Sequence, residues 1–374
     1  MKNVCLIVGA RSTWARLQSV ARAVRDHRSP SSPLPKLRLQ LVVGASALLD
    51  RFGGDSLLPE IKREFRIDEE IYAQVEGDAP GCMALTEGLF TLQLVNAFAR
   101  LKPDVVLVHG DRHEVLAAAV AASYSNVTLA HTEGGEVSGS IDDKVRNAVT
   151  LLSDIEFPVT WQSAVRVRAM NPRAQVYVVG STALDVIAQE DLTTPPDLRG
   201  VGATLDLHRP YLVTVLHPTT TEYGDMWRQA EQVIEAVKTL DMPTVWIWPN
   251  VDAGGDDVSG AIRRWREREN PRNVAFVKNF TPLDYARLLN NCVCLIGNTS
   301  SGIKEGGFLG VPYVLVGGRQ RDRERGGNVT EVACEAAAIV EAAKAQVAHG
   351  KYGRDFRFGK GDAGQQIARI LAEV

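Results

Sequence analysis

The 374-residue chain lacks the features that mark several specialised classes of protein. Its five cysteines are odd in number and show no CxxC spacing, which argues against a disulfide framework or a metal site and predicts reduced thiols in a cytoplasmic protein. A net charge of −3 with scattered Lys and Arg argues against a nucleic-acid partner. The apolar run at the N-terminus is too short to span a bilayer, and we expect no other membrane span.

The chain does contain a regular alternation of predicted strands and helices. At 374 residues it exceeds the usual size of a single core, so two domains are expected. The first alternation runs from a strand at residues 4–8 to one at 176–179, with residues 47–78 expected to be irregular. A second alternation begins with a strand at residues 211–216. This pattern predicts an α/β fold of two Rossmann-like, mostly parallel, doubly wound domains that face each other across a cleft.

A polar segment with a double proline, residues 189–209, is the predicted hinge. We therefore expect an N-terminal domain at residues 1–190 that carries the catalytic carboxylates. Residues 200–355 would form a nucleotide-binding domain. A C-terminal helix within residues 356–374 would pack back on the N-terminal domain.

The stretch from residue 105 to 149 places charged residues just after two successive strands. Asp111 and Arg112 follow the strand at 105–108, and Glu133 follows the strand at 127–130. Ligands bind at this edge of open α/β sheets. A carboxylate there serves as a general acid or base, and an arginine beside it holds phosphate. The structural alternatives are that Asp111 caps the helix beginning near residue 114 and that Glu133 is a surface loop residue.

A capping box, with Ser140 as the N-cap and Asp143 reaching back, is predicted at the next helix, which starts near residue 141. That assignment leaves Asp142 without a structural role. Asp142 lies four residues before Arg146, so the simple interpretation is a helical ion pair. The functional interpretation is a carboxylate held by Arg146 at the edge of the cleft.

In the second domain, a glycine- and serine-rich loop at residues 297–302 precedes a predicted helix. Backbone amides at a helix start form a site for a diphosphate, and the hydroxyls of Ser300 and Ser301 add donors. Glu305 would hold a ribose diol. Such loops are common, so the signal alone is moderate.

Two further residues are candidates for the same site. Arg319 follows the next strand and is able to reach phosphate, although a solvated charge is the alternative and is the preferred interpretation for Arg321, Arg323 and Arg325. His217 ends the strand at 211–216 and would face the cleft, although a histidine before a proline is more often structural.

Taken together, the motifs closely resemble the hydrolysing UDP-N-acetylglucosamine 2-epimerases of sialic-acid biosynthesis. The resemblance covers nearly the whole chain and rests on GDRHE at 110–114, HTEGGEVSGSIDDKVRNAVTLLS at 131–153, GNTSSGIKE at 297–305 and GGRQRDRERGGNV at 317–329. GSIDD with the following arginine resembles the hydrolysing branch of the family. The resemblance implies a glycosyltransferase-B-like fold, a homodimer or homotetramer, and no metal, nicotinamide or other cofactor.

The resemblance also implies roles for the candidate residues. Asp111, Glu133 and Asp142 would be the catalytic carboxylates. The substrate, a nucleotide sugar, would be held by a set of residues in both domains: Arg11, Arg112, Arg146, His217, Ser300, Ser301, Glu305 and Arg319.

The first loop departs from the family's usual R-A-D-Y-S-K pattern, because it reads Arg11-Ser-Thr-Trp-Ala-Arg16. An arginine therefore stands where a lysine is usual, beside the substrate, and this leaves the sugar open. The expected reaction is the conversion of UDP-N-acetylglucosamine and water to N-acetylmannosamine and UDP. The alternatives are the same chemistry on a UDP-2,4-diacetamido sugar or a GDP-linked sugar, a glycosyltransferase of the same fold, and a non-catalytic nucleotide-sugar sensor.

Overall fold

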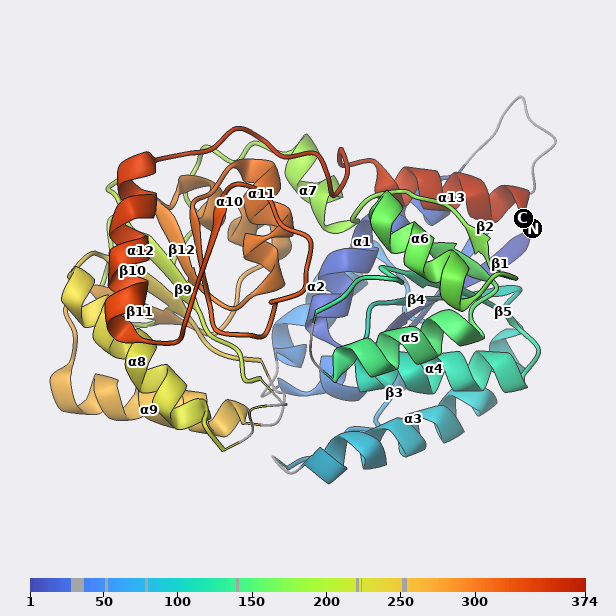
Figure 1. Ribbon diagram of the computed structural model, residues 1–374. Coiled ribbons are helices and arrows are strands. Elements are labelled where there is room, and N and C mark those ends of the chain that lie inside the picture. Colours follow the sequence, from blue (N-terminus) through green and yellow to red (C-terminus); the bar gives the residue numbers. More distant parts are fainter. Residues whose placement is uncertain are drawn as a thin grey trace. The chain divides into compact units, whose positions relative to one another are not determined.

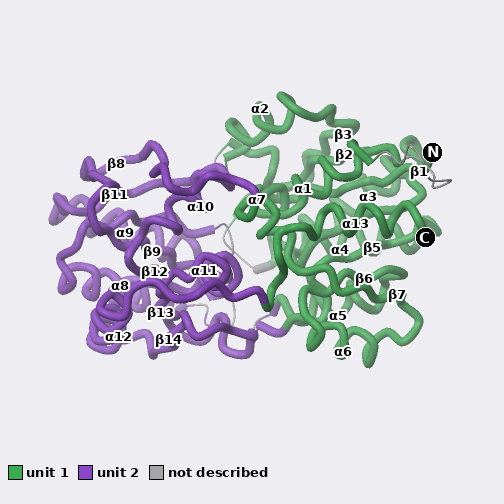
Figure 2. Tube along the Cα trace, turned by 90° about the horizontal axis from the view of Figure 1, so that it is seen from above, with its two compact units in different colours: residues 1–136, 142–188, 357–374 green, residues 137–141, 189–356 purple. Residues whose placement is uncertain are grey.

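A computed structural model describes residues 1–27, 37–50, 53–77, 80–138, 141–219, 222, 224–250 and 254–374. The chain divides into two compact units, coloured separately in Figure 2. Unit 1 comprises residues 1–136, 142–188 and 357–374, and unit 2 comprises residues 137–141 and 189–356. The assignment of residues 189–209 to a hinge stays a prediction.

The centre of unit 1 is a seven-stranded sheet in which every neighbouring pair is parallel, in the order β3-β2-β1-β4-β5-β6-β7 (Figure 1). Its strands are β1 (Lys2–Val8), β2 (Leu37–Gly44), β3 (Glu69–Ile71), β4 (Val105–His109), β5 (Thr128–Thr132), β6 (Ile155–Phe157) and β7 (Gln175–Val176). Its helices are α1 (Arg11–Asp26), α2 (Gly54–Glu64), α3 (Pro80–Leu101), α4 (His113–Tyr124), α5 (Asp142–Leu152), α6 (Trp161–Met170), α7 (Ala183–Gln189) and α13 (Ala363–Glu373), with a short 3-10 helix, η1 (Ala45–Leu48).

Alternate side chains of the buried strands pack into two separate hydrophobic cores, one on each face of this sheet. In β1, Leu6 and Val8 pack with α1, α2 and α13, whereas Cys5 and Ile7 pack with α3, α4 and α5. Successive side chains of a strand point to opposite faces, so a parallel strand that is buried on both sides is continuously apolar. The C-terminal helix α13 lies against α1, within unit 1.

The expectation that residues 47–78 are irregular is wrong. This segment contains η1, α2 and β3. Helix α2 buries Leu57 and Ile61, one turn apart, against the core beneath α1. Its charged outer face and the internal Pro59 concealed this periodicity in the sequence.

Unit 2 also has a seven-stranded sheet, in the order β14-β13-β12-β9-β10-β11-β8, in which only the short β8 pairs antiparallel among the described strands. Its strands are β8 (Val201–Gly202), β9 (Leu212–Val215), β10 (Thr244–Ile247), β11 (Val274–Val277), β12 (Cys294–Gly297), β13 (Tyr313–Val316) and β14 (Val329–Val332). Its helices are α8 (Met226–Leu240), α9 (Gly255–Glu269), α10 (Pro282–Asn291), α11 (Lys304–Leu309) and α12 (Ala336–His349), with a 3-10 turn, η4 (Ser300–Gly302), before α11. The prediction of two mostly parallel, doubly wound α/β domains is confirmed.

Each sheet has one point at which the strand order reverses. In unit 1 it lies between β1 and β4, and in unit 2 between β9 and β12. Loops that leave the carboxyl ends of strands on either side of such a point diverge, which opens a crevice for a ligand. These two points are therefore where a site is expected in each unit.

One expectation about membranes needs correction. Residues 81–101, within α3, form a helix that is long and apolar enough to cross a bilayer by length and composition, although 28% of the apolar window is buried inside unit 1. The expectation that no run beyond the N-terminus approaches a membrane span is therefore wrong by length and composition. Length and composition are weak evidence for a membrane span, because the core helix of a soluble protein has the same properties.

Candidate active site

In unit 1, the loop after β4 brings Asp111 to the buried guanidinium of Arg146. Nη2 of Arg146 bonds the carboxylate of Asp111, and Nη1 bonds the carboxylate of Asp143 and the carbonyl oxygen of Glu136, the last at 2.7 Å. Arg146 is 1% exposed, whereas the carboxylates of Asp111 and Asp143 are 26% and 23% exposed. The buried cation of Arg146 thus fixes the carboxylate of Asp111, which stays partly exposed to solvent.

The charge of Arg146 is maintained in spite of its burial. Burial alone would lower the pKa of this arginine, but the nearby carboxylates of Asp111, Glu136 and Asp143 raise it above its ordinary value. Arg146 pairs with Asp143, three residues before it, and with Asp111, and the pairing of Asp142 with Arg146 stays a prediction. The contact between residues 111 and 146 connects α5 to the end of β4.

The capping role considered for Asp111 does not fit the structure. Helix α4 begins at His113, and the N-cap position belongs to Arg112, so Asp111 stands one residue outside it. The proposed N-cap Ser140 lies outside the described residues. Helix α5 begins at Asp142, which places Asp142 and Asp143 together in its first turn, beside the end of β4 that carries Asp111.

Glu133, directly after β5, has a left-handed backbone with φ of +69°. Such a conformation is costly for a residue with a side chain and is concentrated at functional sites. The two residues that follow must be glycine, because the backbone there passes too close to other groups for a side chain. A Cβ on Gly134 would lie 2.0 Å from Oε2 of Glu156, and one on Gly135 would lie 2.2 Å from the carbonyl oxygen of Ser163. The carboxylate of Glu133 accepts a hydrogen bond from Ser181 at 3.0 Å.

His109, the last residue of β4, faces Glu133 and was missed by the sequence analysis. The hydroxyl of Thr132 donates its one proton to the carbonyl oxygen of Val108 at 3.3 Å, so Nδ1 of His109, at 2.8 Å from that hydroxyl, must be the donor there. This leaves Nε2 directed at Oε2 of Glu133, 3.8 Å away. Nε2 of His109 is therefore the ring nitrogen that faces this carboxylate.

A second buried histidine, His131, supports the loop that carries Asp111. Its Nδ1 lies 3.0 Å from Oε1 of Glu156, and its Nε2 lies 2.8 Å from the carbonyl oxygen of Gly110. Both His131 and Glu156 are fully buried. Burial alone would lower the pKa of His131, but the carboxylate of Glu156 and the carbonyl of Gly110 outweigh it and raise the pKa. A charged pair therefore anchors the loop from beneath.

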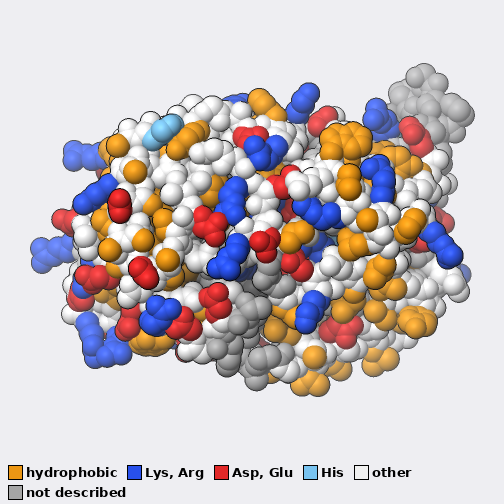
Figure 3. Space-filling model, viewed as in Figure 1, with side chains coloured by type: hydrophobic (Ala, Val, Ile, Leu, Met, Phe, Trp, Pro, Cys, Tyr) orange, Lys and Arg blue, Asp and Glu red, His pale blue; other side chains and the backbone are white. Residues whose placement is uncertain are grey.

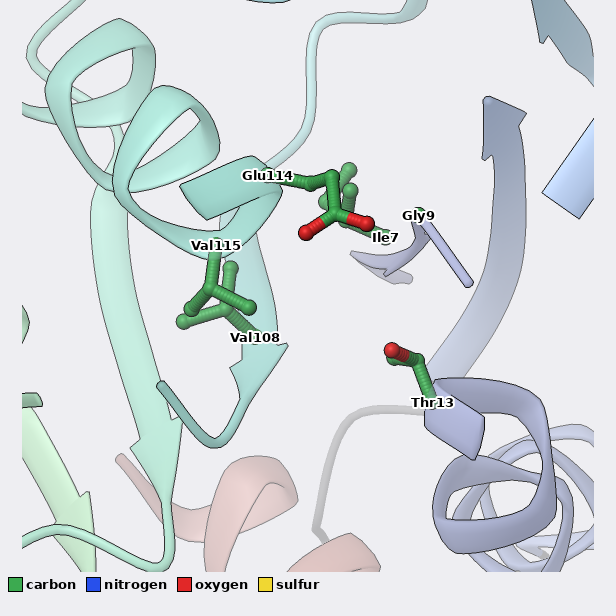
Figure 4. Close-up of a pocket in the computed structure, with 6 residues that line it drawn as sticks. All are labelled: Ile7, Gly9, Thr13, Val108, Glu114 and Val115. Carbon is green, nitrogen blue, oxygen red and sulfur yellow. The ribbon is translucent and has the colours of Figure 1, made fainter. Parts of the chain in front are cut away.

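Glu114 lies in the first turn of α4, at the point where the strand order reverses. Figure 4 shows its carboxylate and the hydroxyl of Thr13 pointing into a small pocket beside Gly9, between the first turns of α4 and α1. Nε of Arg112 lies 3.2 Å from each oxygen of Glu114. Burial would raise the pKa of Glu114, but Arg112 and His113 outweigh it and lower the pKa. Arg112 thus contacts the first turn of α4, and its proposed role in binding UDP stays a prediction.

Arg11 begins α1 and contacts α2. Its Nη1 bonds Oγ of Ser56 at 2.7 Å and lies 3.5 Å from the carbonyl oxygen of Gly53. Burial lowers the pKa of Arg11, against the opposing influence of Glu60 and Asp55. Arg11 therefore holds the start of α2 next to the loop after β1.

In unit 2, Asn298 and His217 join the two loops on either side of the reversal point. The backbone N–H of His217 donates to Oδ1 of Asn298, and Nδ2 of Asn298 donates to the carbonyl oxygen of His217, both at 2.8 Å. Nδ1 of His217 accepts from the backbone N–H of Asn250 at 3.2 Å. A neutral His217 therefore carries its proton on Nε2, which makes that atom a donor.

Hydrogen bonds from neutral groups help to hold the serine-rich loop of unit 2. Gly297 has φ of +143°, and a Cβ there would lie 1.8 Å from the carbonyl oxygen of Val215, so only glycine fits. The hydroxyl of Tyr313 donates between the carbonyl oxygens of Gly297 and Thr299, at 3.0 and 2.9 Å. Oγ of Ser301 lies 2.9 Å from Oγ1 of Thr299. Tyr313 was not singled out from the sequence, because its apolar strand gave it the appearance of a core residue.

The remaining predicted ligands of unit 2 lie around this loop. Ser300 begins η4, and Glu305 lies in the first turn of α11, where it is 4% exposed. Nη1 of Arg319 lies 3.4 Å from the carbonyl oxygen of Asn298. His217, Ser300, Ser301, Glu305 and Arg319 are thus brought together at the carboxyl ends of β9, β12 and β13.

Arg325 differs from the expectation of a solvated charge. Its guanidinium bonds the carboxylate of Glu331 and the carbonyl oxygen of Arg321, so it closes the loop that follows β13. Arg321 itself is exposed, as expected. Within the described ranges, no group of three or more His, Cys, Asp or Glu side chains is arranged to hold a metal ion.

Comparison with known proteins finds one family and full-length relatives. The family model described as UDP-N-acetylglucosamine 2-epimerase matches residues 33–372. A UDP-N-acetylglucosamine 2-epimerase of Neisseria meningitidis serogroup B is 29% identical, over 100% of this chain and 95% of the relative. A UDP-N,N'-diacetylbacillosamine 2-epimerase (hydrolyzing) of Legionella pneumophila is 28% identical, over 100% of this chain and 96% of the relative.

Solved structures agree on the fold. A crystal structure of UDP-GlcNAc 2-epimerase from Neisseria meningitidis bound to UDP-GlcNAc superimposes with a TM-score of 0.80 at 17% sequence identity and covers 100% of both chains. The fold of two parallel-sheet α/β domains is therefore that of the glycosyltransferase-B-like epimerase structures.

Proposed function

The chain belongs to the UDP-N-acetylglucosamine 2-epimerase family, and on that premise we propose that it catalyses the hydrolysing reaction. In this reaction UDP-N-acetylglucosamine and water give N-acetylmannosamine and UDP. The observation that carries the proposal is the contact between Arg146 and Asp111. Arg146 follows the GSIDD block, the feature that resembles the hydrolysing branch, and its guanidinium bonds the first candidate catalytic carboxylate.

The chemistry explains why several carboxylates are needed. The C2 proton of the sugar is not acidified by a neighbouring carbonyl, so its removal must be coupled to departure of UDP from C1. Anti elimination breaks the C2–H and C1–O bonds and forms a C1=C2 double bond. A proton then adds to C2 from the opposite face, and water adds to C1 and loses a proton. Positioned bases and acids carry these protons.

In unit 1, we assign proton transfer at the sugar to Glu133 and Asp142, with Asp111 steadying positive charge at the anomeric carbon. Asp111 suits a fixed electrostatic role because it is bonded to a permanently charged arginine. Glu133 suits proton transfer because Nε2 of His109, a ring nitrogen that takes up and releases protons, lies 3.8 Å from its carboxylate. His109 would then accept a proton from Glu133 between turnovers, so that the carboxylate is ready for the next substrate.

In unit 2, we assign the binding of UDP to the loop after β12. Ser300 and Ser301 supply hydroxyl donors, and His217 and Arg319 supply donors to the diphosphate. Glu305 would accept hydrogen bonds from the ribose hydroxyls. UDP as the leaving group gains charge as the C1–O bond breaks, and donors placed beforehand favour that step.

The sugar is tested by incubating the protein with a panel of nucleotide sugars and following the products by NMR. We expect UDP and free N-acetylmannosamine from UDP-N-acetylglucosamine, without an acceptor. The Legionella relative, almost as similar as the Neisseria one, supports a UDP-2,4-diacetamido sugar as the second candidate. GDP-N-acetylglucosamine belongs in the panel as well. Turnover only when an acceptor is added would replace the proposal with a glycosyltransferase.

The bond that breaks is tested in water enriched in heavy oxygen. Elimination leaves the bridging oxygen on UDP, so UDP should carry no solvent oxygen beyond the level of a control without protein. Attack of water on phosphorus would place solvent oxygen on the nucleotide, and that result would overturn the elimination mechanism.

A further inference from the structure

Ser181, in the turn before α7, bonds the carboxylate of Glu133 from the interior of unit 1. Its hydroxyl donates to Oε1 of Glu133 at 3.0 Å, and Ser181 itself is 1% exposed. The other carboxylate oxygen, Oε2, lies 3.8 Å from Nε2 of His109. The two oxygens of Glu133 therefore have different neighbours, and the bond from Ser181 fixes which oxygen faces which neighbour.

The structural alternative is that the hydroxyl of Ser181 only caps the start of α7. Its Oγ does accept a hydrogen bond from the backbone N–H of Ala183, at 3.4 Å. A hydroxyl has one proton to donate and two lone pairs that accept. The bond from Ala183 uses a lone pair, whereas the bond to Glu133 uses the proton, so the two bonds do not compete. Capping therefore leaves the direction of the proton toward Glu133 unexplained.

A serine suits a carboxylate that transfers protons. The hydroxyl donates to the carboxylate form of Glu133 and, after rotating, accepts from the carboxylic acid form. An arginine, such as the one that bonds Asp111, favours only the charged form of its partner. Ser181 is therefore able to keep Glu133 in one place through a change of its charge.

Ser181 is in turn held by residues 357–364, the return segment, where the chain re-enters unit 1. The backbone N–H of Ser181 donates to the carbonyl oxygen of Phe358 at 2.7 Å. Gly180 and Gly359 meet beside this bond with φ of +84° and +119°. A Cβ on Gly180 would lie 2.8 Å from Cα of Gly359. Side chains are thus excluded at this contact, and the two backbones touch directly.

The far end of the return segment is fixed to α7. The carboxylate of Asp185, a residue that is 5% exposed, accepts hydrogen bonds from the backbone N–H groups of Ala363 and Gly364 at 2.9 and 2.7 Å. Between the two ends, a Cβ on Gly361 would lie 2.2 Å from Cβ of Ala188. The segment is therefore held against α7 and the turn before it along its whole length.

The outer side of the return segment is charged. Arg357, Lys360 and Asp362 are exposed, whereas Phe358 is 2% exposed. Figure 1 shows the segment, in red, passing α7 on its way to α13. In Figure 3 basic and acidic side chains are interspersed along the upper side of the view, where this segment runs. A surface of mixed charge is typical of a solvated face, so the distinctive contacts of the segment are those on its inner side.

We propose that Ser181 is a positioning residue for Glu133 and that the return segment keeps Ser181 in place. The inference rests on the proposed function, in which Glu133 transfers a proton at the sugar. A displacement of about 1 Å at a reacting group costs up to about 100-fold in rate. Ser181 would thus influence the chemical step without touching the substrate.

The first test is Ser181→Ala, alone and combined with Glu133→Gln. In the wild-type background we expect kcat to fall about 30-fold, with KM and the affinity for UDP changed by less than about twofold. In the Glu133→Gln background the same substitution should leave the residual rate unchanged, because the serine acts through the carboxylate that is already lost. Steady-state rates, calorimetry with UDP and melting temperatures are measured for all four proteins.

The second test displaces the return segment without touching Ser181. A Cβ on Gly359 would lie 3.0 Å from Cα of Gly180, so Gly359→Ala pushes the segment away and should lower kcat about 10-fold. The matched control is Gly350→Ala, which also places a side chain at a positive φ, +75°, but meets nothing within 4 Å. It should keep the wild-type kcat. This pair decides the question if Ser181→Ala does not fold.

The outcomes separate this inference from the proposed function. A wild-type kcat in Ser181→Ala, or a further 30-fold loss in the Glu133→Gln background, would overturn the positioning role and leave Glu133 in the chemistry. Equal losses in Gly359→Ala and Gly350→Ala would remove the return segment from that role. Full turnover in Glu133→Gln would instead overturn the assignment of Glu133 itself, and the role of Ser181 with it.

Discussion

The two candidate sites of this molecule occupy equivalent places in their sheets but are built from different interactions. In unit 1 the loops beside the reversal point are held by charges: Arg146 bonds Asp111, and His131 bonds Glu156. In unit 2 the equivalent loops are joined through amide, hydroxyl and backbone groups, with Asn298 bonded to the backbone of His217 and Tyr313 bonded to two carbonyl oxygens, and the charged Arg319 contacts the carbonyl oxygen of Asn298. The same fold therefore supports two kinds of chemistry.

The difference has a physical reason. Stabilising positive charge at the anomeric carbon requires a carboxylate that stays ionised and in place, and the buried cation of Arg146 fixes Asp111 in this way. Binding a diphosphate requires hydrogen-bond donors and a backbone that approaches closely, which a glycine-containing loop supplies. The comparison predicts that charge-removing substitutions impair chemistry in unit 1 and nucleotide affinity in unit 2.

The largest expected effect is at Glu133. Replacing Glu133 by Gln keeps the shape and the bond from Ser181 but removes the base, so turnover should fall about 1,000-fold with UDP affinity unchanged. Steady-state rates and calorimetry measure the two quantities. The control is Glu69→Gln, which changes an acid that pairs with Arg100 on the surface of unit 1. Turnover that survives in Glu133→Gln would remove this residue from the chemistry.

The next effect separates two adjacent aspartates. Asp142→Asn should abolish most turnover with little change in stability, because Asp142 is assigned to proton transfer. Asp143→Asn removes one carboxylate from Arg146, which keeps Asp111, so it should mainly lower the free energy of unfolding, by about 1 kcal/mol. Denaturant unfolding and rate measurements on both variants test the assignment, and the reverse pattern would contradict it.

A smaller effect is expected in unit 2. Glu305→Ala and Arg319→Ala should each weaken UDP binding about 10-fold, or about 1.4 kcal/mol, because each removes one polar contact to the nucleotide. The matched control is Arg321→Ala, a neighbouring arginine that is exposed. Calorimetry with UDP measures all three. Unchanged affinity in both site variants would place the nucleotide elsewhere.

The smallest effect concerns the pH dependence of stability. The pKa of His131 is raised, because the carboxylate of Glu156 and the carbonyl of Gly110 outweigh burial. Its contribution is therefore fully present below about pH 6.5 and is lost as pH rises through the folded pKa. Melting temperatures should fall more steeply above that pH in the wild type than in Glu156→Gln, where the charge that raises the pKa is gone. Equal slopes would show that the pair does not titrate in this range.

Much of the fold was readable from the sequence because parallel strands buried on both faces are continuously apolar, as in β1 and β4. The missed elements have identifiable causes. Helix α2 has few apolar positions and an internal proline. Strand β14 has only exposed or half-buried residues, so it lacks the continuous apolar run that marks the other strands. Helix α7, next to the predicted hinge, was concealed by its length of only 7 residues.

The candidate site was only partly readable. Asp111 and Glu133 were found because they follow strands directly. Their contacts with Arg146 and His109 were not predicted. Arg146 is 35 residues from Asp111 and His109 is 24 residues before Glu133, and such contacts arise only from the order of strands in the sheet. The position of His109 at the end of β4 was the available signal.

The central claim, that carboxylates of unit 1 eliminate UDP from the sugar and water then releases it, is tested most directly by one reaction. UDP-N-acetylglucosamine is incubated with the protein in heavy water, and NMR follows C2 of the sugar and the free nucleotide together. We predict that each UDP released is matched by one free N-acetylmannosamine with deuterium at C2. Free sugar that retains its original C2 proton, or deuterated UDP-sugar without release of UDP, would contradict the account.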